Sequence, residues 1–74
     1  MQPTVGRIVH CWPEKHDPPQ GGTSLTCAAI VTASGADKIC VHYFLPDGAN
    51  GACELPLEEG SAGARGKWWW PPRA

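Results

Sequence analysis

Two stretches of apolar and β-branched residues lie on either side of a short turn and predict a β-hairpin. The first covers residues 25–32 and the second residues 38–45, and neither contains Gly or Pro. Residues 33–37 between them read A-S-G-A-D, a composition typical of a turn. The rest of the chain is expected to add further strands to this pair.

The length of the turn leaves two registers of this hairpin open. A three-residue loop turns the odd-numbered residues of the second stretch to the covered face, namely Ile39, Val41, Tyr43 and Leu45. A four-residue loop turns the even-numbered residues there instead, because a slip of one residue exchanges the two faces. We favour the first register since its row is the more apolar, and it places His42 on the opposite face.

Three further strands are predicted. Residues 4–12 form the first, with a bend at Gly6, and residues 67–70 form the last. Residues 52–57 form another, which ends or lies at an edge because Pro56 cannot donate a hydrogen bond to a neighbouring strand. Five short strands without a helical pattern predict an all-β fold, a small five-stranded SH3-like barrel built as an antiparallel meander.

The length of the chain bounds its organisation. With 74 residues, it is expected to form a single small β-barrel domain over residues 1–74. Two segments have no pattern of alternation, a long loop over 13–24 and a flexible link over 58–66. Such a domain buries only a small core, so its few aromatic side chains carry much of the burial.

The loop over residues 13–24 has two interpretations. It is dense in Pro, Gly and charged residues, and such a segment is often a variable connection that tolerates insertion. Loops of this length in a compact domain are also often functional. On that interpretation it presents Lys15, His16 and Asp17 over a groove.

Three consecutive tryptophans occupy the predicted last strand. Because strand residues alternate between faces, Trp68 and Trp70 share one face and Trp69 takes the other. If Trp68 and Trp70 close the core, Trp69 is expected to lie outside with Lys67, and exposed Trp is enriched at binding hot spots. The candidate binding residues are Trp69, Trp12, His16, Lys15 and Lys67.

The cysteines are dispersed along the chain. Cys11, Cys27, Cys40 and Cys53 form no CxxC pair, and structural zinc sites usually take ligands in such close pairs. Two disulfides are one reading, but the start of the chain lacks the features of a signal peptide, which favours free thiols. We predict no metal and no cofactor.

Composition lowers the expectation for several classes of function. The chain has 6 Lys and Arg against 7 Asp and Glu, so it lacks the basic excess typical of nucleic-acid-binding proteins. No apolar run approaches the roughly 20 residues of a membrane helix, so no membrane partner is expected. Cys40 and His42 share a strand face but have no orienting acid, and we predict that the chain is not an enzyme.

Four short segments carry a resemblance to known proteins. They read V-G-R-I-V-H-C-W at 5–12, A-A-I-V-T at 28–32, V-H-Y-F-L-P-D-G at 41–48 and G-K-W-W-W-P-P at 66–72. The chain resembles short proteins encoded in bacteriophage and prophage genomes, a group without an established activity. The resemblance implies a bacterial cytoplasmic or virion-associated protein. In outline the strand pattern also resembles Tudor and KOW modules.

Two hypotheses of function follow. The first is a non-enzymatic protein-binding or assembly module, which acts through Trp69 and the long loop on a protein partner or on itself. The second is a nucleic-acid-binding SH3-like module, in which the cations Arg7, Arg65, Lys67 and Arg73 meet at paired terminal strands and an indole stacks on a base. Salt dependence distinguishes them, because phosphate binding weakens as salt rises.

Overall fold

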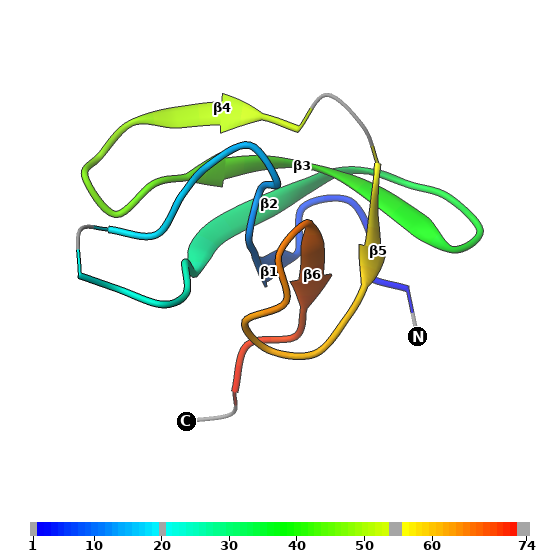
Figure 1. Ribbon diagram of the computed structural model, residues 1–74. Coiled ribbons are helices and arrows are strands. Elements are labelled where there is room, and N and C mark those ends of the chain that lie inside the picture. Colours follow the sequence, from blue (N-terminus) through cyan, green and yellow to red (C-terminus); the bar gives the residue numbers. More distant parts are fainter. Residues whose placement is uncertain (1, 20, 54–55, 73–74) are drawn as a thin grey trace.

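The computed structural model describes residues 2–19, 21–53 and 56–72 and has strands but no helix among them (Figure 1). The strands are β1 (Ile8–Cys11), β2 (Cys27–Ser34), β3 (Lys38–Phe44), β4 (Asn50–Ala52), β5 (Leu57–Glu59) and β6 (Lys67–Trp69). The predicted all-β class is confirmed, and the architecture is consistent with a small SH3-like barrel.

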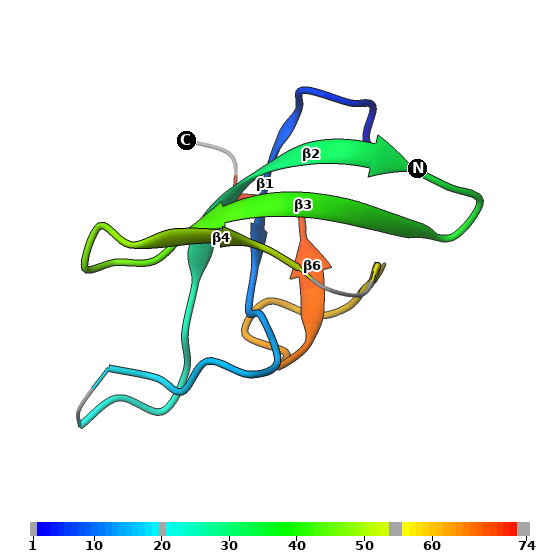
Figure 2. The same cartoon turned by 90° about the horizontal axis from the view of Figure 1, so that it is seen from above.

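The barrel is a closed ring of strands. β1 pairs with β2, β2 with β3, β3 with β5, β5 with β6, and β6 returns to β1, while β4 is added to β3. All these pairs are antiparallel except β5–β6, which is parallel. A closed ring with an odd number of strands cannot alternate in direction all the way round, so the meander needs one parallel seam. Figure 2 shows β2, β3 and β4 side by side, with the described parts of the loop, residues 13–19 and 21–24, extending away from them.

The central hairpin has the register that we favoured. Ala29 lies opposite Tyr43 and Val31 opposite Val41, so odd-numbered residues of both strands face the interior. This register holds as far as Val31, where it shifts by one residue, so the pairs nearest the turn, Ala33–Cys40 and Ser34–Ile39, join odd to even positions. His42 is half-buried on the opposite face, as predicted.

The core combines one very large side chain with several small ones. Trp68 is fully buried at 0% exposure, and its neighbour across the β1–β6 pair is Cys11. Cys11 in turn lies opposite Cys27 on β2. The remaining inward residues of the strands are Val9, Ala29, Val31, Ile39, Val41, Tyr43 and Leu57. Small thiol and alanine side chains on β1 and β2 leave room for the indole, which is why so short a chain can enclose it.

The prediction of a single strand over residues 52–57 is wrong. Its place is taken by two strands: β4 pairs with the Phe44 end of β3, and β5 pairs with the Lys38 end of the same strand. Residues 54–55, including the predicted Leu55, lie outside the described residues. Pro56 immediately precedes β5 and cannot donate to a ladder, so it is compatible with a strand start but not with a strand interior. The link predicted over 58–66 therefore begins after Glu59.

Candidate functional site

The outward side of β1 to β4 carries two rows of residues that cross all four strands. Pairing aligns Ile8, Ile30, His42 and Ala52 in one row and His10, Ala28, Phe44 and Asn50 in the other. We call these eight residues the outer face. It contains no Asp, Glu, Lys or Arg, although charged residues are interspersed along most of the chain.

The outer face is also where large apolar side chains reach solvent. Four such side chains are exposed among the described residues, and three of them belong to this face: Ile8 at 52%, Ile30 at 37% and Phe44 at 41%. Ile8 and Ile30 are direct neighbours across the β1–β2 pair. His42 packs edge-on against Phe44 with ring centroids 5.3 Å apart and hydrogen-bonds Asn50 Oδ1 at 3.1 Å. On this face the His42 ring is held in place by Phe44 and Asn50, and the exposed apolar side chains are available for contact with a partner.

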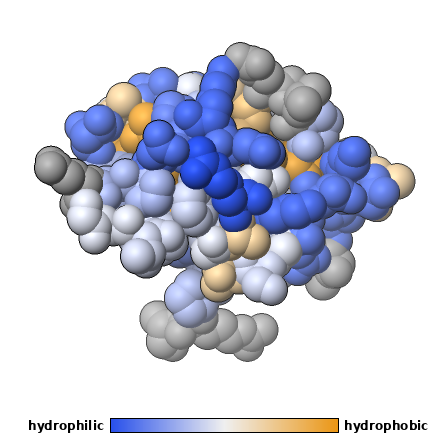
Figure 3. All heavy atoms as spheres, in the orientation of Figure 1, coloured by the Kyte–Doolittle hydropathy of each residue, from blue (hydrophilic) through white to orange (hydrophobic). Residues whose placement is uncertain are grey.

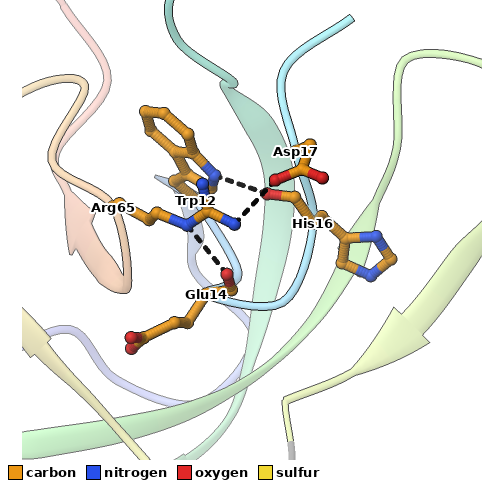
Figure 4. Close-up of polar contacts among 5 residues, drawn as sticks. All are labelled: Trp12, Glu14, His16, Asp17 and Arg65. Atoms are coloured by element: carbon orange, nitrogen blue, oxygen red, sulfur yellow. Dashed lines mark hydrogen bonds and ion pairs between the residues drawn. The ribbon is translucent and has the colours of Figure 1, made fainter.

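A second candidate region lies where the loop over 13–24 begins. The Trp12 indole N–H donates to the carbonyl oxygen of His16 at 2.8 Å, and His16 Nε2 lies 2.8 Å from the Tyr43 hydroxyl. The His16 and Tyr43 rings also meet edge to face, with centroids 5.3 Å apart. The contacts of His16 with Tyr43 therefore hold this half of the loop against β3. Figure 4 shows the bond of the Trp12 indole to the His16 carbonyl.

Arg65 holds the same part of the loop from the other side. Its Nε donates to the Glu14 carbonyl at 2.9 Å and its Nη2 to the Asp17 carboxylate at 2.9 Å, while the guanidinium lies 5.3 Å from the centre of the Trp12 ring (Figure 4). Sequence reasoning did not find this clamp, because Arg65 is far from the loop in sequence. Arg65 and Asp17 are solvent-exposed, and an exposed ion pair contributes little to stability. The contact of the guanidinium with the Trp12 ring and its bond to the Glu14 carbonyl therefore also contribute to holding the loop.

A cavity of about 400 Å³ opens beside this loop. Its lining includes Tyr43, Cys53 and Leu57, with the charged residues Glu14, Lys15 and Lys67 around them. Lys67 Nζ donates to Glu58 Oε1 at 3.2 Å, and this bond with the Lys67 charge lowers the pKa of Glu58. Figure 3 shows that this side of the molecule is largely hydrophilic, with the most polar residues in a band across its centre.

The structure brings together four of the five predicted binding residues. Lys15 and Lys67 line the cavity, His16 binds the Tyr43 hydroxyl beside it, and Trp12 holds the His16 carbonyl. Trp12 is itself buried at 6% exposure. These residues thus form one region, but its indole is covered.

The placement of Trp69 outside the core is wrong. Trp69 is only 5% exposed and belongs to the core cluster, whereas Trp70 is half-buried. Trp68 and Trp70 do share a face, with ring centroids 5.4 Å apart. The alternation rule separates faces but does not say whether the second face is covered, and the register places Trp69 opposite His10 on that second face.

The predicted cluster of cations is not present in the described residues. β1 and β6 do pair, but Arg7 lies 6.0 Å from the Trp70 ring at one end of the pair, and Arg65 lies against Trp12 near the other end. Lys67 and Arg65 are each paired with a carboxylate. Arg73 lies outside the described residues.

All four cysteines are thiols, and their environments differ. Cys11 and Cys27 are buried, and burial raises the pKa of both thiols. Burial, followed by the proximity of Cys40 and Cys27, raises the pKa of the half-buried Cys53 to about 11. The described residues contain no group of three or more His, Cys, Asp or Glu side chains that could hold a metal ion.

The reactivity of Cys53 provides a test of this arrangement. A pKa of about 11, against an ordinary value of 9.0, leaves roughly one hundredth of the usual thiolate at pH 8. We expect iodoacetamide to alkylate Cys53 at least about 100-fold more slowly in the folded protein than in denaturant, with a rate that rises with pH up to about 11. Peptide mass spectrometry over time measures this. Labelling of Cys53 at the denatured rate would contradict the expectation.

Comparison with protein-family models, curated proteins and solved structures finds no match to this chain. None of the described segments is a helix of the length and apolarity needed to cross a membrane.

Proposed function

We propose that this chain is a non-enzymatic assembly module that associates with a second copy of itself through the outer face. The observation that carries the proposal is the absence of charged residues from eight positions on four adjacent strands, together with the exposure of Ile8, Ile30 and Phe44. Burying these three side chains in an interface removes apolar surface from water, and that transfer is favourable.

The lack of charge on the outer face favours a second copy as the occupant. In a symmetric interface the same surface lies on both partners, so a charged side chain near the axis meets its own like charge. An uncharged face avoids this repulsion. The face carries two histidines, His10 and His42, and no carboxylate, ammonium or guanidinium group.

The nucleic-acid hypothesis has weaker support. Its three described cations, Arg7, Arg65 and Lys67, lie at two ends of the β1–β6 pair, and two of them are already paired with carboxylates. The bacteriophage or prophage origin implied by the sequence resemblance stays a prediction, and it is compatible with an assembly role.

The test is the mass in solution of the wild type and of Ile30→Glu. We expect the wild type to form a defined oligomer that persists from low to high salt, because an apolar interface does not depend on counterion release. In Ile30→Glu a carboxylate would have to be buried against the partner, so we expect a monomer at micromolar concentration. Light scattering after size-exclusion chromatography measures both.

Thr23→Glu is the matched control, because it adds the same charge at an exposed position outside the outer face. It should keep the mass of the wild type. A wild type that is monomeric at every concentration, or an Ile30→Glu variant with unchanged mass, would overturn the proposal. Loss of the oligomer at high salt alone would favour a polar interface instead.

A further inference from the structure

β4 is the strand at which the described sheet ends. It pairs with β3 on one side, and no described strand lies on its other side. In Figure 1 it forms the upper margin of the molecule. Natural sheets usually protect such an edge with charged residues or Pro, but β4 consists of Asn50, Gly51 and Ala52.

The pairing with β3 fixes which backbone groups of β4 point outward. Leu45 N–H donates to the Ala49 carbonyl at 2.7 Å, and Cys53 N–H donates to the Val41 carbonyl at 3.2 Å. Hydrogen-bonded and non-hydrogen-bonded pairs alternate along an antiparallel ladder, so Gly51 also directs its amide and carbonyl to β3. The N–H and C=O groups of Asn50 and Ala52 therefore point away from the barrel.

This edge is complementary to itself. If a second β4 lies antiparallel with the two Gly51 residues opposite each other, Asn50 faces the second copy's Ala52 and exchanges both backbone hydrogen bonds with it. The symmetry repeats the same exchange for Ala52. The strand has no charged side chain to repel its copy, and at the axis Gly51 has no side chain.

The second observation is continuity with the outer face. Asn50 and Ala52 are the last members of its two rows, so a paired strand would continue those rows into the neighbouring molecule. Gly51 points to the other side of the strand, where a Cβ would lie 3.1 Å from the Tyr43 hydroxyl. The strand thus presents small, uncharged side chains outward and is supported by Tyr43 from within.

We propose that β4 pairs with β4 of a second copy, antiparallel and symmetric about Gly51, and so joins two barrels edge to edge. The inference rests on the proposed self-association, because a three-residue strand offers few hydrogen bonds and is expected to pair only weakly in its absence. The two contacts use different atoms: side chains of the outer face in one, and the outward backbone groups of Asn50 and Ala52 in the other.

Amide hydrogen exchange followed by NMR tests the pairing on the wild-type protein. We expect the Asn50 and Ala52 amides to exchange at least about tenfold more slowly at about 1 mM than at about 20 µM, because pairing closes them only in the assembly. The Gly51 amide bonds within the chain and should be protected at both concentrations. Fast exchange of Asn50 and Ala52 at both concentrations would overturn the pairing.

Two variants separate this contact from the outer face. Ala52→Pro removes one outward N–H without removing a bond to β3, and we expect it to abolish the concentration-dependent protection of Asn50. Ala52→Val keeps the N–H and should retain that protection. If Ala52→Pro keeps it as well, the edge pairing is wrong.

The outcomes also distinguish this inference from the proposed function. If Ile30→Glu lowers the mass while the two amides always exchange fast, the outer-face assembly stands and the edge pairing fails. If Ile30→Glu has no effect on the mass but the amides are protected at high concentration, the edge pairing stands without the outer-face contact.

Discussion

Replacing Trp68 with alanine is expected to remove most of the free energy of unfolding of the protein. The indole is fully buried at 0% exposure at the centre of the barrel, and truncations of buried Trp cost about 3–5 kcal/mol. A domain of this size has a free energy of unfolding near the lower end of about 5–15 kcal/mol, so the loss removes most of it. Urea denaturation followed by circular dichroism measures the change.

Two variants control for effects other than burial. Trp70→Ala removes a half-buried indole beside Trp68 and should cost distinctly less. Trp68→Phe keeps an aromatic ring and removes an indole N–H that has no hydrogen-bond partner among the described residues, so it should still fold. A Trp68→Ala protein with the wild-type midpoint would mean that this side chain is not the centre of the core.

Replacing Gly60 with alanine is expected to lower the free energy of unfolding by about 1–3 kcal/mol, the typical cost of overpacking. A Cβ at Gly60 would lie 2.8 Å from both Cβ and Cγ of Lys67. The Gly60 amide also donates to the Trp68 carbonyl at 2.8 Å, so the backbone cannot move away without weakening the junction of β5 with β6. Thermal unfolding measures the loss.

A double-mutant cycle identifies the cause of this loss. Lys67→Gly removes the two atoms that a Cβ at Gly60 would approach to 2.8 Å and leaves Ala64 Cβ at an ordinary contact distance of 3.4 Å. Gly60→Ala should therefore cost less in that background than in the wild type. Lys67→Ala keeps its own Cβ and should give only partial relief. If Gly60→Ala costs the same in all three backgrounds, the close approach to Lys67 is not the reason.

Local sequence signals predicted the parts of the fold that depend on neighbouring residues. The odd-numbered row from Ile39 to Tyr43 is apolar, and that pattern alone selected the register that the structure has. The same alternation also places Ile30 and Phe44, two exposed apolar residues of the outer face, together at even positions of the hairpin. The outer face was not recognised there, since an apolar residue on a predicted outward face is common in isolation.

Other features depend on contacts between distant parts of the chain. The burial of Trp69 depends on what packs over the second face of β6, and the three-Trp sequence does not contain that information. The division of 52–57 arises because β3 is long enough to pair with two different strands. The Arg65 clamp joins the loop to residues more than forty positions away, a separation at which composition gives no signal.

The ring of strands has a consequence for how the chain acquires its structure. β1 closes the barrel by pairing His10 with Trp69, so ring closure depends on one of the most distant contacts in the sequence. Until β6 docks between them, β1 and β5 each expose an unpaired edge, and the sheet stays open. Domains dominated by such non-local pairings fold in milliseconds to seconds. Association of these edges between incompletely folded chains is therefore the expected route to aggregation during refolding.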